Sequence, residues 1–386
     1  MQARFNHKIE AIAVSDIRQF DMEVSQIEGI IKLTLGEPDF NTPEHVKRAA
    51  IAAINADQSH YTPNSGIMEL RRVAAKYYKE KYDLDYTPEQ VITTVGATEA
   101  IATSLQTILN PGDTVLMPTP VFPIYAPISQ LNGADVLQVD TSADGFILTP
   151  EKLRATLEEN KDKNIKAVVL VYPSNPTGAT YTKEQLAALA KVIAEYDIWA
   201  LCDEVYAELT YEGQHVSLAS FLPENTIVIG GLSKSHAMTG WRLGFILGPK
   251  DFSEQVVKAH QYMVTAPTTN VQFAALEALT KGKDDALSMR KEYQARRDFM
   301  RQALEDAGFE VVQPDGAFYL FAKIPAKCGH DSWKFVRELA KEAKVALIPG
   351  VSFGQGGEGY VRLSYAASMD DLHQASERIK KFTDNY

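Results

Sequence analysis

The chain has 386 residues, of which 45% are hydrophobic and 23% charged, as is typical of a globular protein large enough for two or three domains. Its formal net charge is −11 at pH 7, and lysine and arginine are spread along the chain. An acidic chain without a basic cluster is not expected to have nucleic acid or an anionic membrane as its main partner.

The beginning of the chain and its cysteines narrow the class of protein further. Residues 1–15 are mixed and polar, unlike a secretory signal, and no stretch approaches the ~20 apolar residues of a membrane span. Cys202 and Cys328 lie far apart and in no metal-ligand spacing, so neither a disulfide framework nor a metal site is expected. We therefore expect a cytoplasmic protein, with Cys202 as a small buried side chain.

Between residues 90 and 250, short apolar runs alternate with helical patterns. The runs are rich in β-branched residues and bounded by Gly, Pro, Asn or Asp, which predicts strands. Several are apolar throughout, as expected for a sheet covered on both faces. The predicted strands are Val91–Val95, Thr114–Met117, Asp135–Val139, Ala167–Tyr172, Ile198–Cys202, Thr226–Gly230 and Leu243–Leu247.

The segment Lys183–Tyr196 predicts a helix between two of these strands. Its apolar residues recur at helical spacing, and Thr182 precedes it as an N-cap. Strands that alternate with such helices predict a mostly parallel, doubly wound α/β domain.

The end of the chain predicts a smaller α/β domain. A long helix, Lys283–Ala307, is followed by Gly308, a residue suited to a helix C-cap. We place an N-terminal arm, part of the small domain, in residues 1–40, a large domain in 41–284 and a small C-terminal domain in 285–386. The remaining predicted elements are a strand Phe318–Ala322, a helix Ser332–Lys344, a strand Ala346–Ile348, a Gly-rich loop 354–359, a strand Tyr360–Ser364 and a helix Met369–Phe382.

Polar residues and glycines follow four of the strands predicted in the large domain. In open α/β sheets, ligands bind beyond the carboxyl ends of the strands. Each group by itself also occurs as ordinary turn or helix-cap chemistry, so it is their coincidence that indicates a site. The four groups are Gly96-Ala97-Thr98, the turn Pro173–Gly178 with Asn175, Asp203 with Tyr206, and Ser233 with Lys234.

Lys234 lies in the segment Ser233–Arg242 between two apolar runs. A partly desolvated amine has a lowered proton affinity and can attack a carbonyl group. Ser233 and Arg242 could hold a phosphate beside it. A reactive amine next to a phosphate site suggests a Schiff base to pyridoxal phosphate (PLP), whereas the alternative is a surface loop with ordinary charged side chains.

Three motifs, in this order and spacing, resemble class I and II aminotransferases, the fold-type-I PLP enzymes. They are Ser174–Gly178, Cys202–Tyr206 and Ser233–Gly244. The resemblance covers essentially the whole chain and is greatest to the bacterial aromatic and broad-specificity subgroup. It implies a homodimer with the active site at the subunit interface. Further matches are Gly36–Phe40, Tyr61 through Arg71, and Gly359–Ser364.

The resemblance implies a role for each residue around the cofactor ring. Lys234 would bind PLP as a Schiff base and later move the proton between the substrate's α-carbon and the cofactor. Asp203 would pair with the protonated pyridine nitrogen, which keeps the ring electron-withdrawing. Asn175 and Tyr206 would hydrogen-bond the phenolic oxygen. Phe122 would stack on the ring face.

Two of these assignments have competitors nearby. Phe122 could instead be a plain core aromatic, and Tyr125 is a second candidate for the stacking position. His236 lies close to Lys234, but we expect it to serve packing, since the lysine already supplies the proton transfer. The loop Gly354–Gly357 is interpreted as a connection to the next strand and not as a phosphate site.

The phosphate and the substrate carboxylate are also placed by the resemblance. Arg362 would clamp the substrate's α-carboxylate in a bidentate pair, next to Asn175, and Gly36 would allow the chain to approach the substrate closely. Tyr61 would reach the phosphate from the neighbouring subunit. Within the subunit, the phosphate would lie among Gly96, Ala97, Thr98, Ser233 and Arg242.

The expected reaction moves the amino group of an L-amino acid, aromatic or of broad specificity, to 2-oxoglutarate in a ping-pong mechanism. No second arginine is evident for an acidic side chain, which disfavours a strict aspartate specialist, but aspartate and N-acetyl-diaminopimelate stay open as substrates. A PLP-dependent C–S lyase would share Lys234, Asp203 and Arg362. A transcriptional regulator built on this fold would need a basic DNA-binding module, which the acidic charge disfavours.

Overall fold

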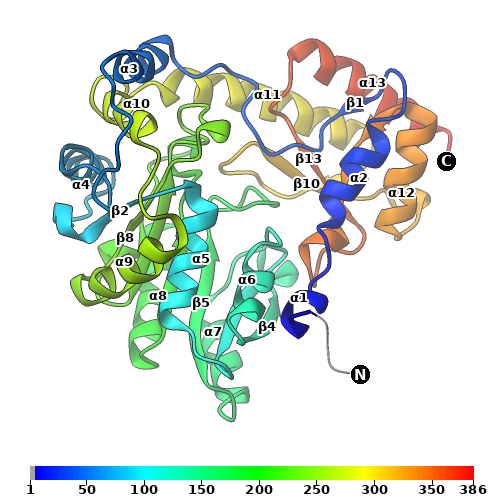
Figure 1. Cartoon of the computed structure of the whole chain (residues 1–386). Coiled ribbons are helices and arrows are strands. Elements are labelled where there is room, and N and C mark those ends of the chain that lie inside the picture. The colour runs from blue at the N-terminus through cyan, green and yellow to red at the C-terminus, as the bar shows by residue number, and fades with distance from the viewer. Residues whose placement is uncertain (1–4) are drawn as a thin grey trace.

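The computed structural model describes residues 5–386 and contains one large sheet (Figure 1). Within the described residues this sheet has seven strands in the order β2-β8-β7-β6-β5-β3-β4. Strand β8 is antiparallel to both neighbours, and the other pairs are parallel. All seven predicted strands are confirmed: β2 (Val91–Thr94), β3 (Thr114–Thr119), β4 (Asp135–Asp140), β5 (Ile165–Val171), β6 (Trp199–Asp203), β7 (Thr226–Gly231) and β8 (Gly244–Leu247).

Both faces of the large sheet are covered, because successive strand residues point to opposite sides. In β5, Ala167 and Val169 pack in one core with helices α5, α6 and α9, while Val168 and Leu170 pack in another with α7 and α8. The predicted doubly wound α/β fold is therefore confirmed. The large-domain helices are α3 (Glu44–Asn55), α4 (Met68–Tyr82), α5 (Gly96–Ile108), α6 (Tyr125–Leu131), α7 (Pro150–Glu159), α8 (Lys183–Glu195), α9 (Lys250–Val264) and α10 (Thr269–Thr280).

The predicted cap of α8 is present. The Thr182 side chain accepts a hydrogen bond from the backbone N–H of Gln185, whose side chain bonds back to the Thr182 backbone. This reciprocal pair satisfies two backbone donors that a helix start otherwise leaves without partners.

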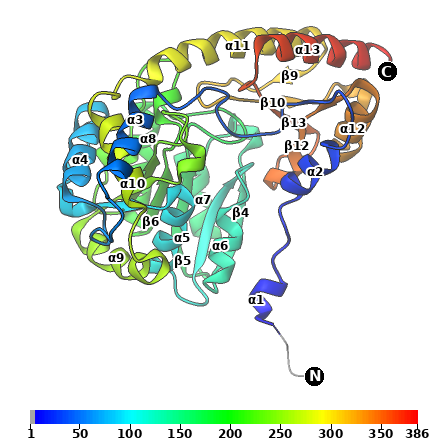
Figure 2. The same cartoon turned by 45° about the horizontal axis from the view of Figure 1, so that its top comes forward.

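The C-terminal part contains a second, four-stranded antiparallel sheet in the order β12-β13-β10-β9. The long helix α11 (Ala286–Asp306) runs from the large domain to this part and lies beside the last helix, α13, as Figure 2 shows. The elements of this part are β9 (Glu310–Val311), β10 (Tyr319–Lys323), α12 (Ser332–Glu338), β11 (Val345–Ala346), β12 (Ile348–Pro349), β13 (Tyr360–Ser364) and α13 (Met369–Asp384).

Two predicted elements of the C-terminal part differ from the structure. The predicted strand Ala346–Ile348 is two short strands, since β11 pairs with the N-terminal arm and β12 pairs with β13. The predicted helix Ser332–Lys344 is α-helical only to Glu338, and a π-helical turn, Leu339–Ala343, completes it. The two halves of the predicted strand therefore join different sheets.

The N-terminal arm packs on the C-terminal part. It contains α1 (His7–Glu10), α2 (Asp16–Val24) and β1 (Ile31–Lys32), and β1 pairs with β11 in parallel. Phe20 and Val24 of α2 are buried in the same core as β10 and β13. The predicted joining of the arm to the small domain agrees with this packing, and the boundaries at 40 and 284 stay a prediction.

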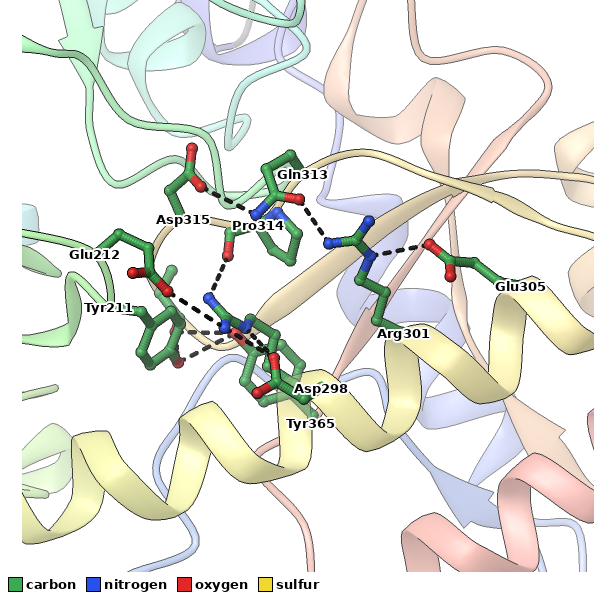
Figure 3. Close-up of polar contacts among 11 residues, drawn as sticks. Tyr211, Glu212, Asp298, Arg301, Glu305, Gln313, Pro314, Asp315 and Tyr365 are labelled. Carbon is green, nitrogen blue, oxygen red and sulfur yellow. Dashed lines mark hydrogen bonds and ion pairs between the residues drawn. The ribbon is translucent and has the colours of Figure 1, made fainter.

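A polar network on α11 fixes the C-terminal part to the large domain (Figure 3). The Tyr211 backbone N–H donates to the Asp315 carbonyl at 2.9 Å. The buried Arg297 guanidinium donates to the Pro314 carbonyl at 3.2 Å, pairs with Asp298 and lies 4.8 Å from the Tyr211 ring centroid. These contacts connect the C-terminal part to the large domain.

Within residues 5–386, no helix combines the length and the apolar character that crossing a bilayer requires. Cys202 is fully buried in the core of the large domain, as predicted.

Candidate active site

The carboxyl ends of β5, β6 and β7 lie side by side in the large sheet. Asp203 is the last residue of β6 and pairs with Val171 of β5 and Ile229 of β7. Asn175 follows β5, and Lys234 follows β7 by a short turn. The sheet therefore brings together three of the side chains that the sequence places at strand ends.

Lys234 is half-buried, and its Nζ donates to the carbonyl of Gly36 at 2.6 Å. The ammonium also lies 5.6 Å from the centroid of the Tyr206 ring and 5.8 Å from that of Phe318. Burial lowers the pKa of Lys234 to about 8, against the opposing effect of the Glu37 and Asp203 carboxylates. Near neutral pH the amine is thus partly neutral, the state that a nucleophile toward a carbonyl group requires.

Asp203 is buried at the end of β6, and its charge acts on Lys234. Its Oδ2 accepts a hydrogen bond from the Tyr125 hydroxyl at 2.7 Å, and its Oδ1 accepts one from the Val205 N–H at 3.2 Å. Burial raises the pKa of Asp203 to about 6, while these hydrogen bonds and the charge of Lys234 act in the opposite direction. A carboxylate that is ionised at neutral pH and faces inward can hold a cationic ring nitrogen.

Tyr125 and Phe122, the two candidates for stacking on the cofactor ring, have different contacts in the structure. Tyr125 is fully buried and its hydroxyl is engaged by Asp203, so it supports that carboxylate. Phe122 is half-buried, and its backbone N–H donates to the Asn175 carbonyl at 2.9 Å. Phe122, whose side chain makes no such hydrogen bond, therefore stays the candidate for the ring face.

Tyr206 is buried, and its hydroxyl lies 2.7 Å from the hydroxyl of Tyr319. Burial raises the pKa of Tyr206 well above its usual value, so the phenol is neutral and can donate a hydrogen bond. Sequence reasoning missed Tyr319. The aromatic run within the predicted strand Phe318–Ala322 was the available signal, but only the pairing of β10 with β13 brings it to the site.

Arg362 is the most unusual charge in the site. Its side chain is buried, with a residue exposure of 2%. It donates to the Asn175 side-chain oxygen at 3.0 Å and to the Thr34 carbonyl at 2.5 Å, while its Nε has no partner among the described residues. The rings of Tyr319 and Phe353 lie 4.7 and 5.0 Å from its guanidinium carbon.

The other two buried arginines of the described chain have carboxylate partners. Arg296 pairs with Asp39 at 2.7 Å, and Arg297 pairs with Asp298 at 2.8 Å. Burial lowers the pKa of Arg362, which has neutral hydrogen-bond partners in the chain. A buried cation without a counter-ion is costly, so the surroundings of Arg362 are suited to an incoming carboxylate.

Gly36 has a structural reason to be glycine. A Cβ at this position would lie 2.3 Å from the Tyr319 hydroxyl, which is far closer than atoms can approach. The close approach lets the Gly36 carbonyl reach Lys234 and brings the arm against the site. The predicted close approach is thus present, and within this chain it is to Tyr319.

The predicted phosphate site lies where α5 begins. Gly96 has a φ of 78°, and a Cβ there would lie 2.5 Å from an Arg242 nitrogen. Gly244 packs as closely on the other side, because its Cβ would lie 2.7 Å from the Ala97 backbone nitrogen. The start of α5, with the backbone of Ala97 and Thr98, and the Arg242 guanidinium therefore meet without side chains between them, as an anion site requires.

Ser233 is half-buried in the turn that carries Lys234, whereas Tyr61 stands apart from the cluster. Tyr61 is 88% exposed, and among the described residues it makes no hydrogen bond to a residue of the site. It could act on a phosphate only in the site of another subunit.

The residues of the site fit PLP. Lys234 offers a partly neutral amine, Asp203 a buried carboxylate, and the start of α5 with Arg242 an open anion site.

His236 is directed away from the lysine. Its Nε2 lies 2.9 Å from the Gly282 carbonyl, and its Nδ1 lies 2.8 Å from the Ser235 hydroxyl. The ring is buried and anchors the lysine turn to the end of α10, in agreement with the predicted packing role. The loop Gly354–Gly357 lies against β4, where the Gln355 N–H donates to the Gln138 side chain at 3.2 Å.

Comparison with known proteins identifies the family. A family model described as aminotransferase class I and II matches residues 28–379. The chain belongs to this family. It is an aminotransferase with amino acids and oxo acids as its substrates, and members of the family use PLP as cofactor.

Relatives of this aminotransferase have different specificities. A probable N-acetyl-LL-diaminopimelate aminotransferase of Bacillus subtilis is 47% identical over 99% of this chain and 96% of that protein. Aromatic-amino-acid aminotransferase 2 of Thermococcus litoralis is 40% identical over 97% of each. A solved structure of the Thermus thermophilus aspartate aminotransferase with maleate is 36% identical, with a TM-score of 0.93 over 99% of this chain and 100% of that one. Similarity therefore decides the reaction class and leaves the substrate open.

Proposed function

We propose that this aminotransferase moves the amino group of an aromatic or other apolar L-amino acid to 2-oxoglutarate, in two half-reactions that share one site. The observation that carries the proposal is the buried Arg362 guanidinium, which has no carboxylate partner among residues 5–386. Every amino and oxo acid substrate has a carboxylate next to the reacting carbon. Arg362 can bind it through two parallel hydrogen bonds and so fix that carbon beside Lys234.

The chain's own residues divide the remaining tasks. When bound, PLP supplies an electron-withdrawing ring that stabilises negative charge at the substrate's α-carbon. Lys234 accepts and returns the proton at its Nζ, for which a pKa of about 8 suits neutral pH. Asp203 holds the ring nitrogen in its protonated form, while Asn175 and the neutral Tyr206 donate hydrogen bonds to the ring oxygen.

Charge around the site supports an apolar or aromatic amino donor. Arg296 and Arg297, the other buried arginines of the described chain, are neutralised by carboxylates and offer no free cation to a second substrate carboxylate. Aromatic rings, those of Tyr319 and Phe353, flank Arg362 instead. A strict aspartate specialist is therefore disfavoured.

N-acetyl-LL-diaminopimelate is the second candidate donor, because the relative with that printed name is 47% identical over 99% of this chain. This compound is larger and carries polar groups at its far end. An assay that offers each donor together with 2-oxoglutarate and measures the glutamate formed compares this compound directly with the aromatic amino acids.

We propose that the active enzyme is a homodimer. Exposed apolar side chains lie on α3, at the end of α9 and in the loop that carries Tyr61: Ile51 and Ile54 are each 55% exposed, and Tyr61 and Tyr262 are each 88% exposed. An apolar surface of this kind is suited to burial against a second subunit. The Tyr61 hydroxyl would then donate a hydrogen bond to the phosphate in the partner's site. Sedimentation velocity would contradict this if the active enzyme sedimented as a monomer.

A panel of amino donors tests the proposal. Phenylalanine, tyrosine, leucine, aspartate and N-acetyl-LL-diaminopimelate are compared by kcat/KM, with 2-oxoglutarate as acceptor. We expect the aromatic donors to exceed aspartate by at least about tenfold, a difference of ~1.4 kcal/mol in transition-state binding. The proposal fails if aspartate or the diaminopimelate derivative is preferred. Pyruvate release from cystathionine without an acceptor would instead indicate a C–S lyase.

A further inference from the structure

A buried histidine and a buried carboxylate connect two helices of the large domain, away from the reacting groups. His260 of α9 is fully buried, and its Nδ1 lies 3.0 Å from an oxygen of Glu99 on α5. Helices α5 and α9 pack against each other on one face of the sheet (Figure 1). A buried ionic pair contributes little net stability, so its presence here suggests a positional role.

Glu99 connects this pair to the phosphate site. Its second carboxylate oxygen accepts a hydrogen bond from the Val95 N–H at 3.0 Å. Val95 directly precedes Gly96, where α5 begins and where we place the phosphate. The carboxylate therefore holds the turn that sets the direction of the first N–H groups of α5.

His260 connects the same pair to the loop that carries Tyr61. Its Nε2 lies 2.7 Å from the Asn64 carbonyl. Two further hydrogen bonds hold this loop: the Asn64 side chain donates to the Thr265 carbonyl at 2.9 Å, and the Thr269 hydroxyl donates to the His60 carbonyl at 2.8 Å. The backbone is thus fixed from within the subunit while the Tyr61 side chain extends outward.

Both ring nitrogens of His260 face acceptors, a carboxylate and a carbonyl, and only the protonated ring can donate to both at once. Burial by itself lowers the pKa of His260, but the hydrogen bond and charge of Glu99, with the Asn64 carbonyl, raise it overall. A neutral histidine could donate to only one of the two acceptors. The charged ring is therefore what connects α5 to the Tyr61 loop.

We propose that His260 is a positioning residue that couples the phosphate-binding start of α5 in its own subunit to the Tyr61 that this subunit presents to its partner. The inference rests on the proposed PLP site and the proposed homodimer. Each His260 then acts on two sites, on its own through Glu99 and on the partner's through the Asn64 carbonyl and Tyr61.

The first test measures how tightly PLP binds to homodimers in which both subunits carry the same substitution, and its readout does not depend on catalysis. PLP is titrated into cofactor-free wild type, His260→Gln and Glu99→Gln, and the dissociation constant is read from the cofactor absorbance. We expect both variants to bind PLP at least tenfold more weakly, with unchanged circular dichroism. His45→Asn is the matched control, because His45 also lies between two carboxylates, Glu277 and Asp285, but is only half-buried and contacts neither α5 nor the Tyr61 loop in any hydrogen bond of the described residues. It should bind PLP as wild type does.

The second test separates the two routes with hybrid dimers. Two differently tagged chains are co-expressed, and one carries Lys234→Ala, so the only working site is built on the other chain's Lys234. We expect His260→Gln to weaken PLP binding at the working site whether it is placed in the chain with Lys234 or in the other chain. An effect confined to the chain with Lys234, or no effect, overturns the proposed coupling.

A third hybrid dimer distinguishes a failure of the His260 coupling from a failure of the proposed dimeric PLP site. Tyr61→Phe is placed in the chain that carries Lys234→Ala. If this change weakens PLP binding at the working site and His260→Gln in the same chain does not, the coupling fails while the dimeric site stands. If wild type fails to bind PLP, or Tyr61→Phe has no effect, the proposed site or dimer fails. Should His260→Gln not fold, Glu99→Gln, which keeps the shape of its side chain and removes the charge that His260 faces, replaces it in each of the two chains in turn.

Discussion

The lowered pKa of Lys234 gives the sharpest quantitative prediction. Burial reduces it from 10.5 to about 8, so at pH 7 about one amine in ten is neutral, compared with about one in three thousand for an ordinary lysine. Because only the neutral amine attacks a carbonyl, the reactive fraction of Lys234 at this pH is about 300-fold larger than the ordinary pKa would allow.

The assay is the condensation of PLP with the cofactor-free protein, trapped by borohydride and quantified by mass spectrometry of the peptide that contains Lys234. The rate is measured from pH 6 to pH 10.5, with the exposed Lys250 in the same digest as a reference amine. We expect the Lys234 rate to rise with a midpoint near pH 8. A midpoint near 10.5 would refute the argument that burial activates this amine.

Glu37 provides a matched variant for this experiment. Its carboxylate accepts a hydrogen bond from the Thr239 hydroxyl at 3.2 Å, and its negative charge raises the pKa of Lys234. Glu37→Gln keeps the shape and removes the charge, so the midpoint should move to lower pH. A move to higher pH would contradict the assigned electrostatics.

Three further substitutions test the remaining parts of the site. Asp203→Asn should retain some PLP but slow proton abstraction by orders of magnitude in single-turnover measurements; a near-normal rate would contradict the electrostatic role of Asp203. Arg362→Lys should lower kcat/KM by about 10²–10³, mainly through KM, because an ammonium cannot replace the planar fork; an unchanged KM would mean that the carboxylate binds elsewhere. Gly36→Ala should impair substrate binding through the clash with the Tyr319 hydroxyl, and adding Tyr319→Phe should restore part of it; no restoration would separate the defect from that contact.

The strands and the residues that end them could be predicted from the sequence for a simple physical reason. A buried parallel sheet requires short, continuously apolar runs, and between residues 90 and 250 such runs alternate regularly with turn residues and helical patterns. Asp203 ends one such run, and Asn175 and Lys234 follow two others within a few residues. Once the runs pair, the three side chains meet at one edge of the sheet without any further information.

Contacts between distant segments were not predictable in this way. Tyr125 and Tyr319 are both ordinary core aromatics by pattern, and only the packed structure directs their hydroxyls at Asp203 and Tyr206. The break between β11 and β12 has the same origin, since it depends on which partner each half of the segment finds. Local sequence specifies what a segment can form, and packing selects the partner.

The site contains three charges that burial opposes, and they differ in how the fold compensates them. Asp203 has two hydrogen-bond donors from its own chain, and Lys234 has the Gly36 carbonyl. Arg362 has neutral acceptors and an Nε with no partner among the described residues. Substrate therefore completes the charge that the fold leaves least compensated. Because a carboxylate is common to donor and acceptor, we propose that the same guanidinium serves both half-reactions and that the aromatic rings beside Arg362 contribute to side-chain selectivity.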